Sequence, residues 1–317
     1  MNLLRRIKKL LIDPYYVIGR FMMKHCPRVM SDRFFIKVRW SQVVGYKLDL
    51  KHPKKFNEKL QWLKLYDHKP EYTIMVDKYR AKQWLADKIG EQYVVPTLSI
   101  YKSVDEIDLN KLPDQFVLKC NHDSGSVIIC RDKQSFDFEN AKQKLNKALH
   151  SNYYWRCREW PYKHVKPVIL AEPFIYNSQT DNISVGGMPQ VLPSDYKFYC
   201  FEGEPKLFYI TTDKGMDVPI REDFFDLQGN HLDIQDSNYL NNPMYIPNIP
   251  NNLQEMQSIC RMISKNINHL RVDFYECNGR IYVGEMTFYE AAGYCNFEPS
   301  KWNIILGDWI KLPIDSH

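Results

Sequence analysis

Acidic and basic residues alternate with apolar ones between residues 271 and 287. Asn278-Gly279 near the centre of this segment is a strong signal for a tight turn, so the segment is predicted to form a β-hairpin. A three-residue loop that begins at Cys277 and ends in a glycine bulge would gather the polar side chains on one face, with Arg271 opposite Glu285. That face would hold Arg271, Asp273, Glu285 and Thr287.

Two carboxylates on neighbouring strands lie roughly 5 to 8 Å apart. Such a pair suits a hard divalent cation, because Mg²⁺ is commonly held by one or two carboxylates together with the phosphate oxygens of a nucleotide. The hairpin alone leaves a second interpretation open, in which Arg271 and Glu285 form a cross-strand ion pair and Asp273 faces solvent.

Lysines stand near three further elements that could bind phosphate. Lys119 lies in an apolar strand predicted over residues 115–121, where a charge is costly unless it is paired. A loop of small residues follows this strand, and its backbone N–H groups could face phosphates. The candidate residues of the loop are Ser124, Gly125 and Ser126. Lys82 lies in a helix predicted from Asp77 to Leu85, and Lys197 in a strand predicted over 195–201; the alternative for both is a solvated surface lysine.

An aromatic segment spans residues 152–162 and also holds two arginines. Aromatic faces suit sugar rings and guanidinium groups suit carboxylates, so a uronic acid or a nucleotide sugar could bind there. The candidate residues are Tyr154, Trp155, Arg158 and Trp160. The alternative is an aromatic cluster that covers the core.

Charge is distributed unevenly along the 317 residues. Residues 1–64 contain 16 Lys+Arg and 4 Asp+Glu, a net charge of +12, and since the whole chain carries +5 the remainder carries 5 − 12 = −7. The eight cysteines form no Cys-x-x-Cys motif, which predicts a reduced, cytoplasmic protein. No nucleic-acid recognition motif accompanies the basic residues, so nucleic acid is not an expected partner.

Residues 1–11 place leucines and an isoleucine at helical spacing, with arginines and lysines on the other side. A basic amphipathic helix of this kind can lie on anionic lipid at the inner face of a membrane, or pack its apolar side on the protein. No apolar run reaches the roughly 20 residues that cross a bilayer. The predicted units are a basic helical segment (1–68) and two subdomains (69–176 and 177–317).

The ordered set of lysines, acids and arginine resembles the ATP-grasp ligases, which include the D-alanyl-D-alanine ligases. Phe116 to Gly125, Asn152 to Trp155 and Arg158 to Trp160 look like one branch, the teichuronopeptide-synthesis-like ATP-grasp proteins of bacterial surface polysaccharide clusters. The resemblance implies an α+β fold in which two subdomains grip ATP. It also implies an ADP-forming ligase that joins a uronic acid carboxylate to an amino acid or another amine through an acyl phosphate.

The resemblance further implies a role for each site residue. ATP and Mg²⁺ are the expected cofactors. The phosphates would be bound by Lys82, Lys119 and Lys197, with Arg271 and Lys197 acting in catalysis. Glu172 and the hinge residues Phe174 and Ile175 would face the adenosine. Magnesium would be held by Asp273, Glu285 and Thr287, where the family has an asparagine at the third position. Two other classes stay open: a glycosyltransferase, although the chain has no Asp-x-Asp motif, and a non-catalytic nucleotide- or sugar-binding protein.

Overall fold

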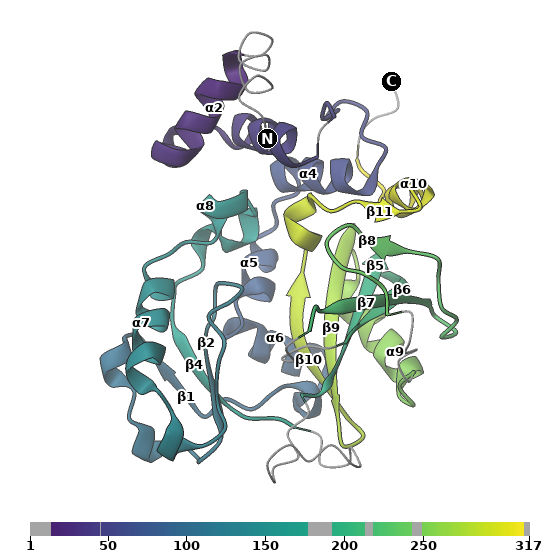
Figure 1. Ribbon diagram of the computed structural model, residues 1–317. Helices are drawn as coiled ribbons and strands as arrows, with labels where there is room; N and C mark the ends of the chain where they lie inside the picture. Colours follow the sequence, from purple (N-terminus) through teal and green to yellow (C-terminus); the bar gives the residue numbers. More distant parts are fainter. Residues whose placement is uncertain (1–13, 45, 177–191, 213–217, 243–248, 314–317) are drawn as a thin grey trace.

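Two antiparallel sheets, one in each of two lobes, organise the chain (Figure 1). The computed structural model describes residues 14–44, 46–176, 192–212, 218–242 and 249–313. The α-helices are α2 (Pro14–His25), α3 (Asp32–Val43), α4 (Phe56–Tyr66), α5 (Pro70–Val76), α6 (Arg80–Ile89), α7 (Phe138–Leu149), α8 (Tyr154–Cys157), α9 (Leu253–Ser264) and α10 (Lys301–Trp309). The strands are β1 (Ser99–Tyr101), β2 (Phe116–Cys120), β3 (Ile128–Cys130), β4 (Ile169–Pro173), β5 (Ser194–Phe201), β6 (Glu204–Thr212), β7 (Arg221–Asp226), β8 (Gln235–Asp236), β9 (His269–Cys277), β10 (Arg280–Thr287) and β11 (Phe297–Glu298).

The first lobe carries, within the described residues, a four-stranded sheet in the order β1-β4-β2-β3. Its strands are short and apolar, and Phe116, Leu118 and Ile169 are fully buried. Helix α7 packs against the sheet through Leu145, which joins the same core cluster. The strand predicted over 115–121 is thereby confirmed as β2.

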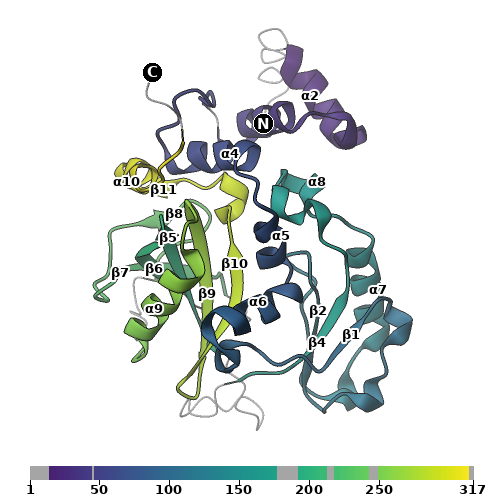
Figure 2. The same cartoon turned by 180° about the vertical axis from the view of Figure 1, so that it is seen from behind.

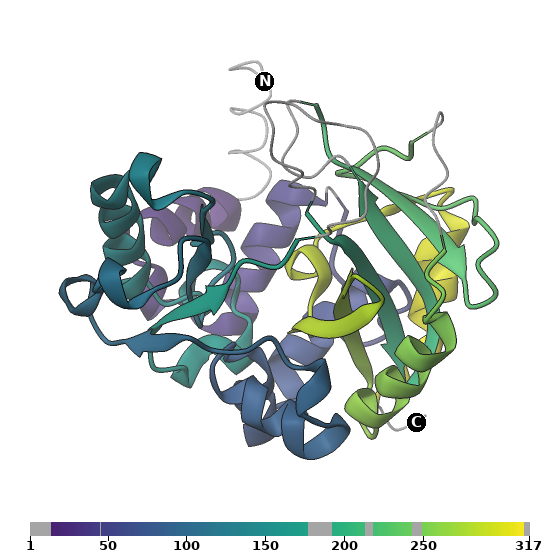
Figure 3. The same ribbon diagram turned by 90° about the horizontal axis from the view of Figure 1, so that it is seen from below.

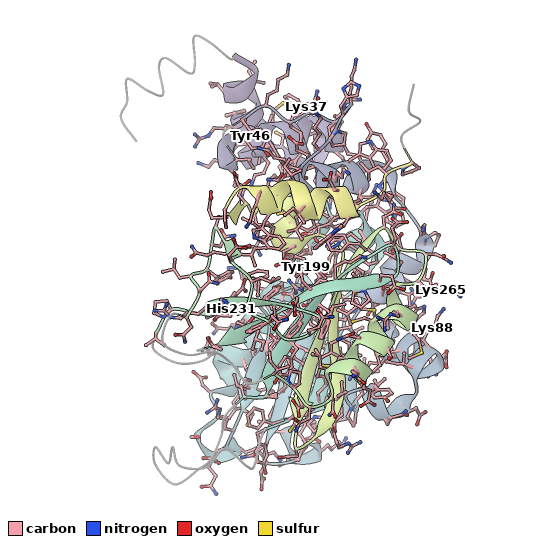
Figure 4. All side chains as sticks on the ribbon, turned by 90° about the vertical axis from the view of Figure 1, so that its right-hand side faces the viewer. Lys37, Tyr46, Lys88, Tyr199, His231 and Lys265 are labelled. Carbon is pink, nitrogen blue, oxygen red and sulfur yellow. The ribbon has the colours of Figure 1, made fainter. Side chains whose placement is uncertain are left out.

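The second lobe carries, within the described residues, a five-stranded sheet in the order β10-β9-β5-β6-β7. Helix α9 covers one face of this sheet through Met256, Ile259 and Ile263, which are buried in the largest core cluster (Figure 2). Alternating residues of β5 and β9 point to the other face, and that face carries the charged side chains of the site. Tyr199, labelled in Figure 4, shares this second face with Lys197 and is buried there against Phe56 of α4.

Helices α5 and α6 lie between the two lobes (Figures 1 and 3), and the N-terminal helices α2, α3 and α4 form a layer at one end. The predicted helix that follows Asp77 is α6; it begins at Arg80, since the Asp77 carboxylate caps the preceding turn, and it ends before Gly90 at φ 105°. The segment of residues 1–11 lies outside the described residues, so its predicted helix is not described. The boundaries at 68/69 and 176/177 stay predictions.

The hairpin of β9 and β10 forms as predicted, but the predicted register is wrong. The turn has two residues, Asn278 and Gly279, both at positive φ, and the extra residue is a bulge at Gly284. Asp273 therefore lies directly opposite Glu285, and Arg271 lies opposite Thr287. A Cβ at position 284 would lie 2.5 Å from the ring of Tyr275, so this close approach of strand and ring requires glycine.

The sequence predicts an α+β fold with a helical N-terminal segment, and this architecture is confirmed. Within the described residues, it consists of the two larger antiparallel sheets, a two-stranded sheet of β8 and β11, and the helices between and beside them.

Candidate functional site

Lys82 and Lys119 converge on one carboxylate in the first lobe. Their Nζ atoms lie 2.7 Å and 2.6 Å from the two carboxylate oxygens of Glu172. The sheet register explains the contact to Lys119, because Glu172 is paired with the residue two positions before Lys119, so the two side chains are diagonal neighbours on one face. Burial raises the pKa of Glu172, but Lys119 and Lys82 more than offset this and hold it below its ordinary value.

A third lysine, Lys78, was not predicted as a site residue. It lies in the turn before α6, and its Nζ is 2.9 Å from a carboxylate oxygen of Glu285 on β10 and donates to the carbonyl of Asp123 at 2.8 Å. Burial lowers the pKa of Lys78, but the Glu285 carboxylate raises it by more than burial lowers it. The pKa therefore lies above its ordinary value, and the charged form is favoured. Lys78 therefore joins the segment between the lobes to β10 of the second sheet.

These side chains line one narrow cavity, here called the lysine cavity. Its charged lining consists of Lys78, Lys82, Lys119, Glu172 and Glu285. Residues of α5, α6 and β10, together with Val94, Val95 and Tyr275, form the rest of the wall. At about 30 Å³ the cavity has room for little more than one water molecule. Nucleotide phosphates could reach these lysines only if their ion pairs with Glu172 and Glu285 open. The phosphate oxygens would then take the place of the carboxylates as partners of the three lysines.

A dense charge network lies on the face of the second sheet that α9 does not cover. Arg271 donates from Nε and Nη2 to both oxygens of Asp273, each at 2.6 Å, and contacts Glu290 through Nη1. Lys197 contacts Asp195, and its Nζ lies 3.5 Å from Asp273. Lys197 lies directly opposite Asp273, because β5 and β9 are neighbouring strands. The two predicted catalytic residues, Arg271 and Lys197, thus both contact the predicted metal ligand Asp273.

The residues present suit a magnesium ion bound through nucleotide phosphates. Asp273 and Glu285 face each other across two paired strands, and both supply hard oxygen donors. Among the described residues no group of three or more His, Cys, Asp or Glu side chains could hold a metal by itself. Two carboxylates completed by phosphate oxygens and water fit the usual coordination of Mg²⁺. Thr287 lies on the same face, and its metal role stays a prediction.

The predicted phosphate loop and hinge differ in how exposed they are. Ser124 and Gly125 are exposed, and Gly125 takes a φ of 118°. The buried Ser126 hydroxyl is engaged within the loop, because it donates to Asp123 at 2.6 Å and accepts from the backbone N–H of Cys120 at 2.9 Å. Of the hinge residues, Phe174 is buried and Ile175 is partly buried. Neither lines the lysine cavity.

The aromatic segment favours the alternative interpretation, a cluster that covers the core. Arg158 is fully buried, donates to the carbonyl oxygens of Pro27 and Met30, and packs on the rings of Phe35 and Trp155. The buried Tyr154 hydroxyl donates to Asp32 at 2.6 Å. Both residues hold the N-terminal helices, which leaves them no free face for a substrate. Trp160 stacks on His68 with ring centroids 4.7 Å apart.

Other residues of the same segment line a larger cavity of about 440 Å³, here called the second cavity. It lies at the end of the hairpin away from the turn, because Arg271, Glu285 and Thr287 form part of its wall. The remaining charged residues of the wall are Arg39, Arg156, Glu159 and Glu290, none of which was predicted as a site residue. Glu285 lines both cavities, so the lysines and the second cavity meet at this carboxylate.

Comparison with protein families gives a match over most of the chain. A family model described as TupA-like ATP-grasp matches residues 58–311. The comparison with curated proteins finds no significant match.

Solved structures with a similar fold include two kinds of ligase. D-alanine–D-alanine ligase from Bacillus anthracis, complexed with ATP, has 15% sequence identity and a TM-score of 0.38, over 68% of this chain and 54% of that one. The corresponding ligase from Helicobacter pylori has 15% identity and a TM-score of 0.42, over 81% and 70%. An L-amino acid ligase from Bacillus licheniformis has 11% identity and a TM-score of 0.45, over 80% and 55%. The chain thus spans little more than half the length of the first and the third.

Proposed function

Because the chain belongs to the TupA-like ATP-grasp family, we propose that it is an ATP-dependent, ADP-forming ligase that joins a carboxylate to an amine. The carboxylate is proposed to belong to a uronic acid of a bacterial capsule, O-antigen or teichuronopeptide, and the amine to an amino acid or a similar compound. One observation carries the proposal: Glu285 lies 2.9 Å from Lys78 in the lysine cavity and also lines the second cavity. A phosphate donor and an acceptor bound in the two cavities would meet there.

The reaction needs two steps, because a carboxylate is a poor electrophile. In the first step a carboxylate oxygen attacks the terminal phosphorus of ATP; a new O–P bond forms, the bond to the ADP oxygen breaks, and ADP leaves. In the second step the amine nitrogen attacks the carbonyl carbon of the acyl phosphate. A C–N bond forms, the bond from carbon to the phosphate oxygen breaks, and the amine loses a proton as inorganic phosphate leaves.

Charge is the main obstacle to the first step. Two anions at 4 Å repel each other by about 4 kcal/mol at an effective dielectric constant of 20. Lys119, Lys197 and Arg271 are fixed cations that would offset this repulsion and align the reacting groups. A magnesium ion held by Asp273 and Glu285 would supply further neutralisation of phosphate charge.

The proposed place of action is the cytoplasmic face of a membrane. Among the residues that the structure describes, no helix combines the length and the apolar character needed to cross a bilayer. The basic residues 1–11 support a peripheral association with anionic lipid instead, which would bring the enzyme near lipid-linked saccharides.

The test is a substrate panel with product identification. Purified protein is incubated with Mg²⁺ and either ATP or nucleotide sugars, together with uronic acids and amino acids, and the products are analysed by mass spectrometry. The expected result is ADP, phosphate and an amide. Asp273→Asn should abolish this turnover, whereas Glu276→Gln on the same strand should retain it. Release of UDP would instead indicate a glycosyltransferase. Nucleotide binding without turnover of any pair would indicate a non-catalytic protein.

A further inference from the structure

The second cavity is lined by a basic and an acidic side chain that lie outside the network of Arg271. They are Arg39 from α3 and Glu159 from the segment after α8, and no ion pair joins them among the described residues. We propose that the amine substrate is an amino acid, whose carboxylate binds Arg39 while its ammonium group faces Glu159. The inference rests on the proposed function, because it assigns the amine side of the same ligase site.

Arg39 lines the second cavity, and its guanidinium group forms no ion pair and no hydrogen bond among the described residues. Its Nε is enclosed by protein, so a ligand would reach the guanidinium group through the Nη atoms. A carboxylate is the group that pairs best with such a cation, because its hydrogen bonds from a guanidinium group are charge-assisted. Arg156 lines the same cavity but is exposed and lies over the ring of Tyr153, so Arg39 is the better-placed carboxylate partner.

Among the three acids of the cavity wall, Glu159 is the one that forms no ion pair with a basic side chain of the described residues. It is buried, and within the described residues no ion pair to its carboxylate is formed, whereas Glu290 contacts Arg271 and Glu285 pairs with Lys78. The nearby Lys64 directs its ammonium group to the carbonyl oxygens of Cys157 and Ala292. Burial raises the pKa of Glu159 to about 7. A cationic group of a ligand beside it would favour its charged form.

The structure holds α3 firmly enough to define the position of Arg39. At the beginning of the helix, Asp32 accepts from the Tyr154 hydroxyl and lies 3.4 Å from Nε of the buried Arg158. Near its end, Trp40 is buried and donates from Nε1 to the carbonyl of Tyr46 at 2.8 Å. The aromatic segment thus serves the site indirectly, because it fixes the helix that carries Arg39.

A simple amine has no anionic group that could bind to Arg39. The carboxylate that becomes phosphorylated must lie beside the transferring phosphate, where Arg271 and Lys197 stand. A second anion-binding residue, Arg39, would then bind a carboxylate that does not react. An amino acid carries such a carboxylate beside its amine, and a simple amine does not. Arg39 precedes the residues that match the family model, so this contact is a property of the N-terminal helices of this chain.

Calorimetry with the full-length protein tests the inference. ADP is titrated first in the presence of Mg²⁺, and each of the twenty L-amino acids is then titrated into the complex. The tightest binder is compared with the amine that remains when its α-carboxylate is removed. We expect at least tenfold weaker binding of that amine. If ADP fails to bind, the proposed function fails with the inference; if ADP binds and no amino acid does, only the inference is overturned.

Two variants on one helix separate a binding role from a structural one. Arg39→Ala should weaken binding of the selected amino acid at least tenfold, and Arg39→Lys should weaken it less, since a charge remains. Lys37→Ala is the matched control, because Lys37 is exposed on the same helix (Figure 4) and should leave binding unchanged. ADP affinity should be equal in all variants. Equal amino-acid affinity in Arg39→Ala and wild type would overturn the inference, as would equal binding of the decarboxylated amine.

Discussion

Replacing Glu172 by glutamine should cost the protein about 3 to 5 kcal/mol of folding free energy, because two lysines lose one buried counter-ion. Glu172 is 4% exposed, and its oxygens lie 2.7 Å from Lys82 Nζ and 2.6 Å from Lys119 Nζ. At an effective dielectric constant of 20 each pair gains about 6 kcal/mol, of which desolvation removes a large part. A lysine with its ordinary pKa can lose its proton at pH 7 at a cost of about 4.6 kcal/mol. The loss of folding free energy per unpaired lysine cannot exceed this cost, because the neutral form would then be preferred.

Urea unfolding at pH 7 measures this loss for the wild type and for Glu172→Gln. Glu139→Gln is the control, because Glu139 pairs with Lys142 on the exposed surface of α7 and should change stability by less than about 1 kcal/mol. ADP with Mg²⁺ should stabilise Glu172→Gln more than the wild type, since phosphate replaces the missing carboxylate. If Glu172→Gln unfolds like the control and differs only in its choice between ATP and GTP, Glu172 faces adenine, and its contact with the lysines contributes nothing to stability.

Three further predictions concern the lysines, one buried acid and the N-terminal segment. Lys119→Ala should weaken ADP binding by calorimetry, whereas Lys197→Ala should lower phosphate release at unchanged ADP affinity; the opposite pattern would reverse their roles. Burial and neighbouring carboxylates raise the pKa of Glu222 to about 9. The folded protein therefore retains a proton that the unfolded chain has released, and stability falls by up to about 1.4 kcal/mol per pH unit between roughly pH 5 and 9. Glu222→Gln should flatten this decline in thermal unfolding, and identical pH profiles would contradict the assignment. Residues 1–11 should carry the protein to phosphatidylglycerol vesicles in flotation at low salt and release it at high salt; no flotation at either salt would leave only the packed helix.

Local signals in the sequence predict the hairpin, but they do not predict its register. Alternation and Asn278-Gly279 indicate two strands and a tight turn, and both are present. The extra residue lies at Gly284 rather than in the turn, because the ring of Tyr275 approaches the backbone there. A glycine inside a strand is a known signal for a bulge, so the correct register could have been considered from the sequence.

Local sequence patterns do not predict contacts between residues that lie far apart in the chain. Lys78 stands in an ordinary turn before a helix, and its importance depends on Glu285, which only the fold brings to 2.9 Å. Arg39 likewise looks like one of many basic residues of the N-terminal segment. The resemblance singles out Lys82, Lys119 and Lys197 as candidate site residues, whereas it gives no such guide to Lys78 and Arg39.

Glu285 is the residue through which the two cavities depend on each other. It pairs with Lys78 in the lysine cavity, lies opposite Asp273 on the sheet, and forms part of the wall of the second cavity. Burial raises its pKa, but Lys78 and Arg271 more than offset this, so the carboxylate is held as an anion. If phosphates and a cation bind in the lysine cavity as proposed, the pair of Glu285 with Lys78 would have to exchange partners. Because the same carboxylate lines the second cavity, the proposed nucleotide binding would change the electrostatic potential that the second substrate meets.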